Sequence, residues 1–323
     1  MNNYGFEHGV IFDGNGSAKE ISFEQLDDYN TNMGILWVHF DYTHEQSIDW
    51  ITNKSNIDSL AIDALLSQVT RPRTTILNDS LILALRGINL NVNSDREDMI
   101  SIRLYINKNI IITTKKRDLL SVNDIKKSFK EGKGPKNSSD FLIDLVDNLT
   151  QRMEDYILDI DDRYSDVEEL SIEESNSKLR TKISEIKREC ISLKRYLSPQ
   201  REAIFKLYDQ KISWINEHER IQLREINHKL IKYIEDLDSI KDKVSLIQEE
   251  ISNNLSEQLN QRMYVLSIIS AIFLPLGFLT GLLGINVGGI PGSENSFSFY
   301  IFTGFLIFVV VIQLYIFKKK KWL

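Results

Sequence analysis

Two long apolar segments near the C-terminal end dominate the hydrophobic pattern of the chain. Residues 263–283 and 297–317 are each about 21 residues long, and between Met263 and Phe317 the only acidic or basic residue is Glu294. About 20 apolar residues in a helix cross the hydrocarbon core of a bilayer. A buried helical hairpin in a soluble protein is the alternative, but helices that are apolar on all sides rarely reach this length outside membranes. The pattern therefore predicts transmembrane helices over 263–284 and 297–317.

The charges that flank these segments predict their orientation. Arg262 precedes the first segment, and four lysines at 318–321 follow the second. Because basic residues stay on the cytoplasmic side, both termini should face the cytoplasm, and the connecting loop, 285–296, should lie outside. The glycines and Pro291 of that loop favour a tight turn. Residues 318–323 then form the basic cytoplasmic tail of a multi-pass protein of the inner or plasma membrane.

The first 120 residues alternate short β-like and helical patterns, which predicts a cytoplasmic α/β region with a mixed sheet and flanking helices. Segments rich in Ile, Leu and Val predict strands at 9–12, 35–40, 80–85, 100–106 and 110–114. Helices are expected at 45–52 and 57–68. Residues 121–215 form a helical region, with helices expected at 138–167, 173–197 and 198–214 and a break at Ser198–Pro199.

One long helix is predicted from residue 216, because the chain then lacks proline until Pro275 and glycine until Gly277. Apolar residues recur at alternating spacings of three and four, which indicates a packed helix seam. About 65 residues at 1.5 Å each give a rod of roughly 100 Å. It comprises a stalk helix over 216–262 and the first transmembrane helix, and it ends near Gly284. The seam consists of Ile226, Leu230, Tyr233, Leu237, Ile240, Val244, Ile247, Ile251, Leu255 and Leu259.

A polar stripe follows another face of this predicted helix. At 100° per residue, Glu250, Asn253, Glu257 and Asn260 fall within about 80° of one another. A solvated face is the simplest interpretation. If several helices pack around an axis, however, the stripe and its upward continuation would surround a narrow conduit with an acidic, amide-lined inner mouth. The continuation consists of Met263, Leu266, Ser270, Leu274, Gly277 and Gly281.

The net charge of −7 divides unevenly along the chain. Residues 263–323 carry one glutamate and four lysines, a net of +3, so residues 1–262 carry −10. An acidic soluble part argues against nucleic acid as a partner and is compatible with the attraction of cations. The single cysteine, Cys190, excludes an intrachain disulfide and a cysteine-based zinc cluster, and its surroundings predict an inert, partly buried thiol. The N-terminal residues predict no signal peptide.

A membrane-anchored enzyme or signalling domain is the alternative from another functional class. Gly132-Lys133-Gly134 lacks the spacing of a Walker loop, and the sequence offers no recognisable pairing of a nucleophile with a base. The sequence therefore predicts no enzyme activity and no resident cofactor.

A specific motif ends the first apolar segment. Residues 271–292 read AIFLPLGFLTGLLGINVGGIPG, with the tripeptide Gly284-Ile285-Asn286 between the two predicted spans. This closely resembles the CorA superfamily of divalent-cation transporters, whose first span ends in Gly-Met-Asn, and the C-terminal KKKKWL fits the same superfamily. The Gly-Ile-Asn variant is similar to the ZntB zinc-transporter branch. The soluble part agrees with that branch through LWVHF (36–40), RPR (71–73) and ALRGIN (84–89).

The resemblance covers essentially the whole chain and implies a homopentamer that moves divalent cations through a central pore, with zinc as the cargo. Five first spans would line the pore, the second spans would face lipid, and the soluble domains would form a funnel. Two spans per chain cannot enclose a pore, so geometry also requires several copies. A CorA-type magnesium or cobalt channel is the nearest alternative. The direction of transport and its coupling to protons stay open.

Gly284, Ile285 and Asn286 form the expected selectivity motif. Asn286 would place a ring of amides at the outer mouth, where amide oxygens can hydrogen-bond the water around an ion; a helix C-cap is the alternative role. Neither span contains His, Cys, Asp or Glu, so no ligand set for a bare zinc ion exists there. The cation is therefore expected to cross at least partly hydrated. The remaining outer-loop residues are Val287, Gly288, Gly289, Ile290, Pro291, Gly292 and Glu294.

Glu294 would concentrate cations at the entrance or would simply be a solvated loop acid. In the soluble part, Asp159, Asp162 and Asp166 belong to an acidic tract, which is expected to be a solvated surface or, second, a regulatory cation site. Two histidines and an aspartate in the segment 39–44 suggest a metal site, but their place at the end of a strand favours a structural or capping role.

Overall fold

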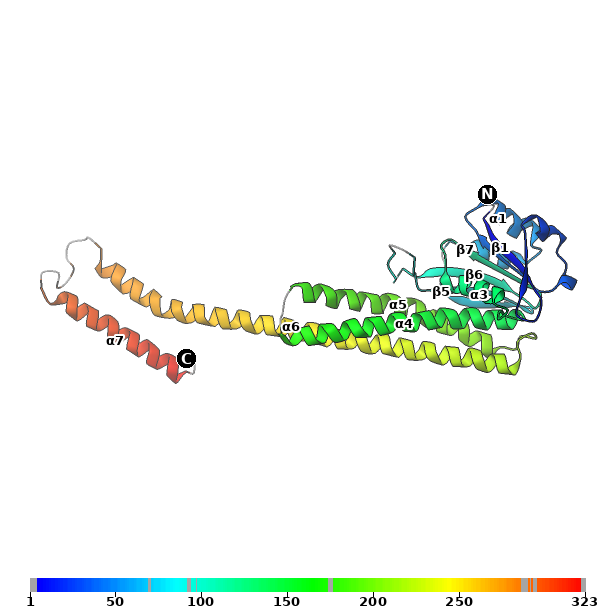
Figure 1. Cartoon of the computed structure of the whole chain (residues 1–323). Helices are drawn as coiled ribbons and strands as arrows, with labels where there is room; N and C mark the ends of the chain where they lie inside the picture. The colour runs from blue at the N-terminus through cyan, green and yellow to red at the C-terminus, as the bar shows by residue number, and fades with distance from the viewer. Residues whose placement is uncertain are drawn as a thin grey trace. The chain divides into compact units, whose positions relative to one another are not determined.

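The computed structural model describes residues 5–68, 71–91, 94–96, 98–173, 177–285, 290, 292 and 295–320 (Figure 1). The strands are β1 Phe6–Phe12, β2 Ala18–Ile21, β3 Leu36–Asp41, β4 Arg73–Leu77, β5 Ser80–Gly87, β6 Ile100–Ile106 and β7 Ile110–Lys115. The α-helices are α1 Glu45–Asp49, α2 Ser59–Leu66, α3 Leu120–Lys130, α4 Ser138–Glu173, α5 Ser177–Asp209, α6 Glu217–Leu283 and α7 Ser298–Lys319. Two compact units divide the chain, Met1–Gln248 and Glu249–Leu323, and α6 contributes to both.

The strands form one mixed sheet in the order β2-β1-β3-β7-β6-β5-β4. β3 and β7 are parallel, and the other neighbours are antiparallel. The five strands predicted from apolar runs are confirmed as β1, β3, β5, β6 and β7. The sequence pattern missed β2 and β4, which are the two edges of the sheet, because edge strands bury less apolar surface.

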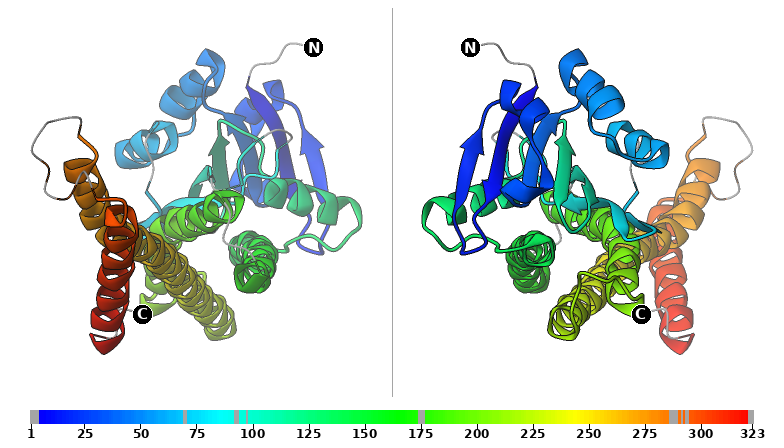
Figure 2. Two further views of the ribbon diagram at one scale, coloured as in Figure 1. Left: turned by 90° about the vertical axis from the view of Figure 1, so that its left-hand side faces the viewer. Right: turned by 90° about the vertical axis from the view of Figure 1, so that its right-hand side faces the viewer.

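Each face of the sheet is covered by different helices (Figure 2). On one face, Val38, Phe40 and Ile112 pack in a core with Ile51, from the π-helical turn Trp50–Lys54, and Leu65 of α2. On the other face, β3 contributes Trp37, whose ring lies 4.8 Å from Phe141 of α4 and 6.2 Å from Phe129 of α3. Alternation along each strand sends neighbouring apolar residues to opposite faces, and both faces are buried.

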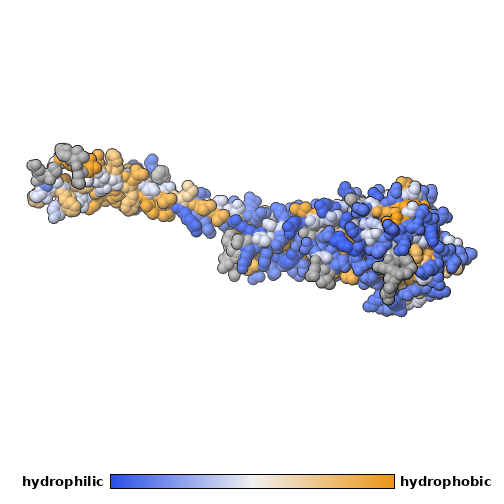
Figure 3. Space-filling model, turned by 90° about the horizontal axis from the view of Figure 1, so that it is seen from above, coloured by the Kyte–Doolittle hydropathy of each residue, from blue (hydrophilic) through white to orange (hydrophobic). Residues whose placement is uncertain are grey.

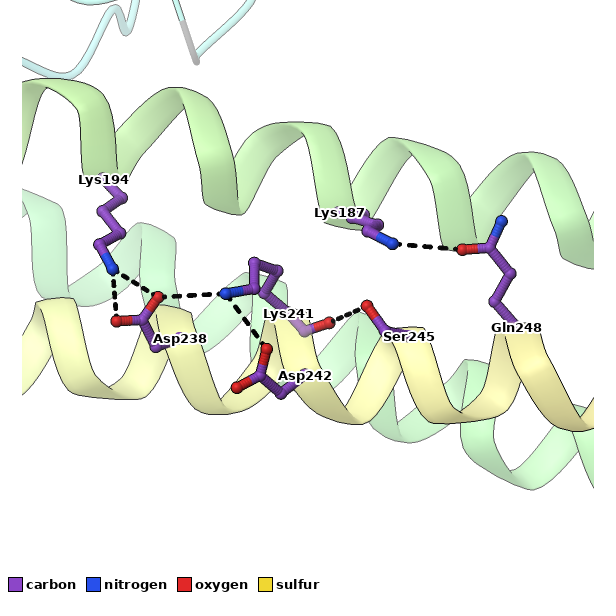
Figure 4. A network of polar contacts seen from close by, with 7 residues as sticks. All are labelled: Lys187, Lys194, Asp238, Lys241, Asp242, Ser245 and Gln248. Carbon is purple, nitrogen blue, oxygen red and sulfur yellow. Dashed lines mark hydrogen bonds and ion pairs between the residues drawn. The ribbon is translucent and has the colours of Figure 1, made fainter.

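The helices α4, α5 and the N-terminal part of α6 pack along a continuous apolar seam. The predicted seam residues from Ile226 to Ile251 are buried, whereas Leu255 and Leu259 are exposed. Polar contacts join α5 to α6 beside the seam (Figure 4). Lys194 Nζ contacts both carboxylate oxygens of Asp238 at 2.7 and 2.6 Å, and Lys187 Nζ donates to Gln248 Oε1 at 3.4 Å. Cys190 of α5 is buried, and desolvation raises its pKa to about 12, as an inert thiol requires.

The predicted break at Ser198–Pro199 is wrong, because α5 runs through Pro199 to Asp209. A proline inside a helix costs roughly 3 kcal/mol, since it removes a backbone donor and crowds the preceding turn. Here the buried stripe continues across the proline without a change of phase, through Leu193, Leu197, Ile204 and Leu207. Burial of that stripe against the rest of the unit outweighs the local cost, and sequence pattern alone does not reveal it.

The α/β prediction with a long helix and two C-terminal apolar helices is therefore confirmed. The predicted pentamer concerns several copies of the chain and stays a proposal.

Candidate functional site

The second unit consists of two antiparallel helices that are long and apolar enough, by length and composition, to cross a membrane. They are the C-terminal part of α6 and the whole of α7, and the apolar segment of each is unburied in the single chain. Figure 3 shows the apolar surface gathered on these helices, while the surface of the sheet-containing unit is mainly hydrophilic. Apolar side chains without a protein cover are expected where lipid or further copies of the chain surround a helix.

The two helices contact each other through one face apiece. The partly buried residues of α6 are Ile268, Ile272, Pro275, Leu276 and Leu279, and those of α7 include Phe302, Leu306, Val309, Val310 and Gln313. One interhelical hydrogen bond joins Gln313 Nε2 to the carbonyl oxygen of Ala271 at 3.4 Å. The other partly buried side chains named here are apolar, as is usual for neighbouring transmembrane helices.

The residues predicted to line a pore lie on the face of α6 directly away from α7. At 100° per residue, their mean direction is about 170° from that of the α7-facing residues. All of them are exposed in the single chain. They are Asn260, Met263, Leu266, Ser270, Leu274, Gly277 and Gly281, and this set is called the lumen face below. The structure thus leaves the face free for contacts outside the chain.

Two glycines of the lumen face have no explanation within the chain. A Cβ atom added to Gly277 or to Gly281 would meet nothing within 4 Å. Glycine in a helix interior is unfavourable by about 1 kcal/mol relative to alanine. Close approach to something outside the chain, either another helix or a narrow conduit, is a physical reason for this choice.

The residues proposed for the inner mouth do not lie on the same side of α6 as the lumen face. Glu250, Asn253 and Glu257 are exposed on α6. In a straight helix their mean direction is about 120° around the axis from the lumen face. The acidic stripe therefore does not run straight into the lumen face. Left-handed supercoiling of packed helices would make the angle between the acidic stripe and the lumen face smaller, but the two would still point in different directions.

The proposed selectivity motif lies just beyond the end of α6. Gly284 N donates to the carbonyl oxygen of Thr280 at 2.9 Å, which continues the helical bonding by one residue, and Ile285 is exposed. A Cβ at Gly284 would lie 2.8 Å from that same oxygen, so the position favours glycine. Asn286, Val287, Gly288, Gly289, Pro291 and Glu294 lie outside the described residues.

The described end of the outer loop is held by a short hydrogen-bonded turn. Gly292 has φ of +88°, a conformation that glycine adopts readily. Its carbonyl oxygen accepts from Asn295 N at 3.1 Å and from Ser298 Oγ at 2.6 Å. These bonds tie the loop to the first residue of α7, in keeping with the tight turn expected from the sequence. Ile290 is partly buried.

The acidic tract of the soluble unit does not come together as a cluster. Asp159 lies 3.3 Å from Arg163 and 3.7 Å from Arg96, and Asp162 and Asp166 are exposed on α4. Within the described ranges, no group of three or more His, Cys, Asp or Glu side chains is arranged to hold a metal ion. The arginine partners of Asp159 compete with any cation for its carboxylate.

His39 has a structural environment. It is buried on β3, and its Nδ1 lies 2.7 Å from Thr113 Oγ1. That hydroxyl also accepts from Trp37 Nε1 at 2.9 Å and donates to the carbonyl oxygen of Val38 at 3.1 Å. Burial, with smaller repulsion from Lys115 and Lys126, lowers the pKa of His39 to about 3. A neutral imidazole inside a hydrogen-bond network fits the structural role that was expected.

Comparison with known proteins bears on the whole chain. Residues 32–319 match the family model described as CorA-like Mg2+ transporter protein. The chain is 34% identical over 311 residues to the Zinc transport protein ZntB of Yersinia enterocolitica, covering 96% of this chain and 94% of that relative. It is 34% identical over 322 residues to the Divalent cation transporter CmaX of Pseudomonas aeruginosa, covering 99% and 97%.

Solved structures agree with these sequence matches. The structure of the full-length CmaX protein superposes with a TM-score of 0.88 at 33% identity and covers 100% of this chain and 99% of that chain. The CorA magnesium transporter from Methanocaldococcus jannaschii has a TM-score of 0.80 over 98% of both chains. At 14% identity, this second likeness concerns the fold alone.

Proposed function

The chain belongs to the CorA family, and we propose that it transports divalent cations, with Zn2+ as the principal cargo, through a central pore made by several copies. The observation that carries this proposal is the lumen face, which is exposed, opposite α7 and supplied with two otherwise unexplained glycines. A single pair of helices cannot enclose a water-filled path, so the lumen face acts only in an assembly. We infer a homopentamer in the inner or plasma membrane, with both termini in the cytoplasm.

Zinc is proposed over magnesium on two grounds. The Gly284-Ile285-Asn286 tripeptide resembles the zinc branch, and several relatives at 32–34% identity are named zinc transport proteins. The second candidate is a magnesium or cobalt channel, which is favoured by the family description and by the absence of nitrogen and sulfur zinc ligands from the two spans. In both cases the ion crosses at least partly hydrated, since amides and hydroxyls are the polar side chains offered by the lumen face.

Proton coupling, if present, acts outside the hydrocarbon core. The two spans contain no Asp, Glu, Lys, Arg or His that could relay a proton. Glu294 in the outer loop and Glu250, Asn253 and Glu257 toward the inner end are the groups that we propose near the mouths. Their role there is to concentrate cations rather than to coordinate them. Asp159, Asp162 and Asp166 are a second proposal, for a regulatory cation site, in which a cation would compete with Arg96 and Arg163 for the carboxylate of Asp159.

The function is tested by flux measurements on purified protein in liposomes. We expect Zn2+ to enter or leave loaded vesicles faster than Mg2+ or Co2+, and a proton-linked mechanism predicts that an imposed pH gradient changes the zinc rate. Liposomes without protein give the background flux, and liposomes treated with an ionophore give the maximal flux. Magnesium flux with little zinc, insensitive to the gradient, would establish the magnesium-channel alternative. No flux of any of the three ions would refute transport.

Asn286 is proposed to select the ion through its hydration shell. Asn286→Ala should remove the amide ring and lower zinc flux by about tenfold or more, because several polar contacts are lost around one axis. Asn295→Ala, in the same loop but outside the tripeptide, is the matched control and should retain most of the flux. Unchanged flux in Asn286→Ala would end the selectivity role and leave Asn286 with a capping role only.

A further inference from the structure

A proline interrupts the backbone hydrogen bonding of α6 within its apolar segment. Pro275 lies inside the helix, on the side that contacts α7. Because proline has no backbone N–H, the carbonyl oxygen of Ala271, four residues earlier, loses the donor that an unbroken helix would supply. In the hydrocarbon core of a bilayer no water replaces such a donor, so a freed carbonyl needs a partner from the protein.

Gln313 of α7 supplies this partner. Its Nε2 donates to the carbonyl oxygen of Ala271 at 3.4 Å. The orientation of the amide follows from its chemistry, since a carbonyl oxygen can accept only from the nitrogen end. Within the described part of the chain, Oε1 of Gln313 is buried without a hydrogen-bond partner, so the contact uses only the donor end of the amide.

Gln313 differs from the other polar residues of the two apolar segments. It is the only carboxamide in the second segment, and a buried amide in an apolar environment is costly unless it is hydrogen-bonded. The hydroxyls of Ser267, Thr280 and Thr303 donate to carbonyl oxygens of their own helices. Gln313 instead reaches the neighbouring helix, at the carbonyl that the proline leaves without its helical donor.

Pro275 also divides the lumen face into two parts. Ser270 precedes the proline, whereas Gly277 and Gly281 follow it and lead to Gly284. Helices bend at proline, because the ring crowds the preceding turn. Gly284 lies nine residues beyond Pro275, about 14 Å along the helix axis, so a change of about 10° in the bend would move it by about 2 Å. A shift of this size is large for a conduit that admits a partly hydrated ion.

We propose that Gln313 is a positioning residue for the ion path. It holds the open turn before Pro275 through the carbonyl oxygen of Ala271 and thereby fixes the bend of α6. This inference rests on the proposed function, because it takes the lumen face as the lining of the pore. Through this hydrogen bond α7 acts on the shape of the pore without lining it.

A comparison in two backgrounds tests the hydrogen bond itself. Pro275→Ala restores a backbone N–H that can donate to Ala271, so the amide of Gln313 is no longer needed. Gln313→Leu should speed hydrogen–deuterium exchange over residues 268–282 about threefold or more in the natural protein and change it little in Pro275→Ala. Mass spectrometry of the full-length protein in detergent measures this exchange. Thr303→Val removes a hydroxyl that donates within its own helix, and as the matched control it should leave exchange in α6 unchanged.

Zinc flux into liposomes tests the effect on the ion path. Gln313→Leu should lower the flux about threefold or more in the natural protein and should leave the flux of Pro275→Ala unchanged. An equal loss in both backgrounds would assign Gln313 to helix packing and overturn the proposal. Unchanged exchange or unchanged flux in Gln313→Leu alone would also overturn it.

The two measurements separate this inference from the proposed function. If Pro275→Ala itself were inactive, the exchange comparison would decide between the hydrogen bond and simple packing. Absence of transport by the natural protein would refute the proposed function, whereas the exchange comparison would still confirm or refute the bond between Gln313 and Ala271.

Discussion

His39 shows how a polar residue is used inside this protein. Its ring is 5.2 Å from that of His8, and burial is the main cause that lowers the pKa of both imidazoles. Repulsion from Lys115 and Lys126 lowers the pKa of both imidazoles further. Both histidines are therefore neutral in the folded chain at neutral pH, and the hydroxyl of Thr113 organises the ring of His39 together with Trp37.

This environment predicts a loss of stability in mild acid. The folded pKa of His39 is about 3, below its unfolded value near 6.5, so the unfolded chain binds more protons between these values. Stability is complete above about pH 6.5 and falls as the pH is lowered. The natural protein should lose about 2 kcal/mol at pH 5 through this one residue. Urea unfolding in detergent at pH 7 and pH 5, followed by circular dichroism, measures the change.

His39→Gln should show a smaller difference between the two pH values, because glutamine does not titrate. His228→Gln changes an exposed histidine on α6 and should behave as the natural protein does. If His39→Gln kept the whole pH dependence, another group would be responsible, such as His8, whose pKa burial also lowers well below its ordinary value.

At the scale of the elements, α6 has two different surroundings along its length. Its seam is buried through Ile251, after which almost every residue is exposed up to Leu283. On α7 the face away from α6 carries Gly304, where an added Cβ would also meet open space. Gly277 and Gly304 therefore have equally open surroundings in the single chain. They differ in position, because Gly277 lies on the lumen face of α6 and Gly304 lies on the outer face of α7.

This pair of glycines offers a matched test of the lumen face. Gly277→Val should lower ion flux by about tenfold or more, because the side chain would narrow the proposed conduit. Gly304→Val should have little effect on flux, because in the proposed assembly this position faces lipid. Flux into liposomes, normalised to the amount of assembled protein, is the measurement. Equal losses in both variants would point to a general packing defect, and no loss in Gly277→Val would exclude it from the conduit.

At the scale of the whole molecule, the proposed assembly places Ser270 of every copy around one axis. Oxidative cross-linking distinguishes this arrangement from others. Ser270→Cys should form disulfides between copies, and Phe308→Cys, on the opposite side of α7 from its contact face, should form few. The native Cys190 will not interfere, since its thiol is buried and its pKa is raised to about 12. Native mass spectrometry of the same samples should show five copies. If Phe308→Cys formed disulfides between copies and Ser270→Cys did not, α7 rather than α6 would surround the axis.

Some features of this protein are determined by the sequence alone. The apolar runs at 263–283 and 297–317 predict the two C-terminal helices, because length and hydrophobicity are local properties. The central strands are likewise local runs of Ile, Leu and Val, and the Gly284-Ile285-Asn286 tripeptide between two spans identifies the family. Helical periodicity alone also groups Ser270, Gly277 and Gly281 on one side of the helix, and the role of that side as the lining of a pore stays a proposal.

Other features were decided by tertiary structure, because they depend on contacts between segments that are distant in sequence. The uninterrupted α5 follows from burial of Leu197 and Ile204 on both sides of Pro199, and the edge strands β2 and β4 exist through pairing with their neighbours. The seam residues Leu255 and Leu259 have the same spacing as the buried ones, yet they are exposed in the single chain. The burial of Arg103 against Tyr42 could not be foreseen, since only the fold brings the ends of β3, β5 and β7 together around it. The burial of a side chain and the charge around it depend on all of its neighbours in space. Many of these neighbours come from distant parts of the sequence, so the periodicity of one segment does not predict them.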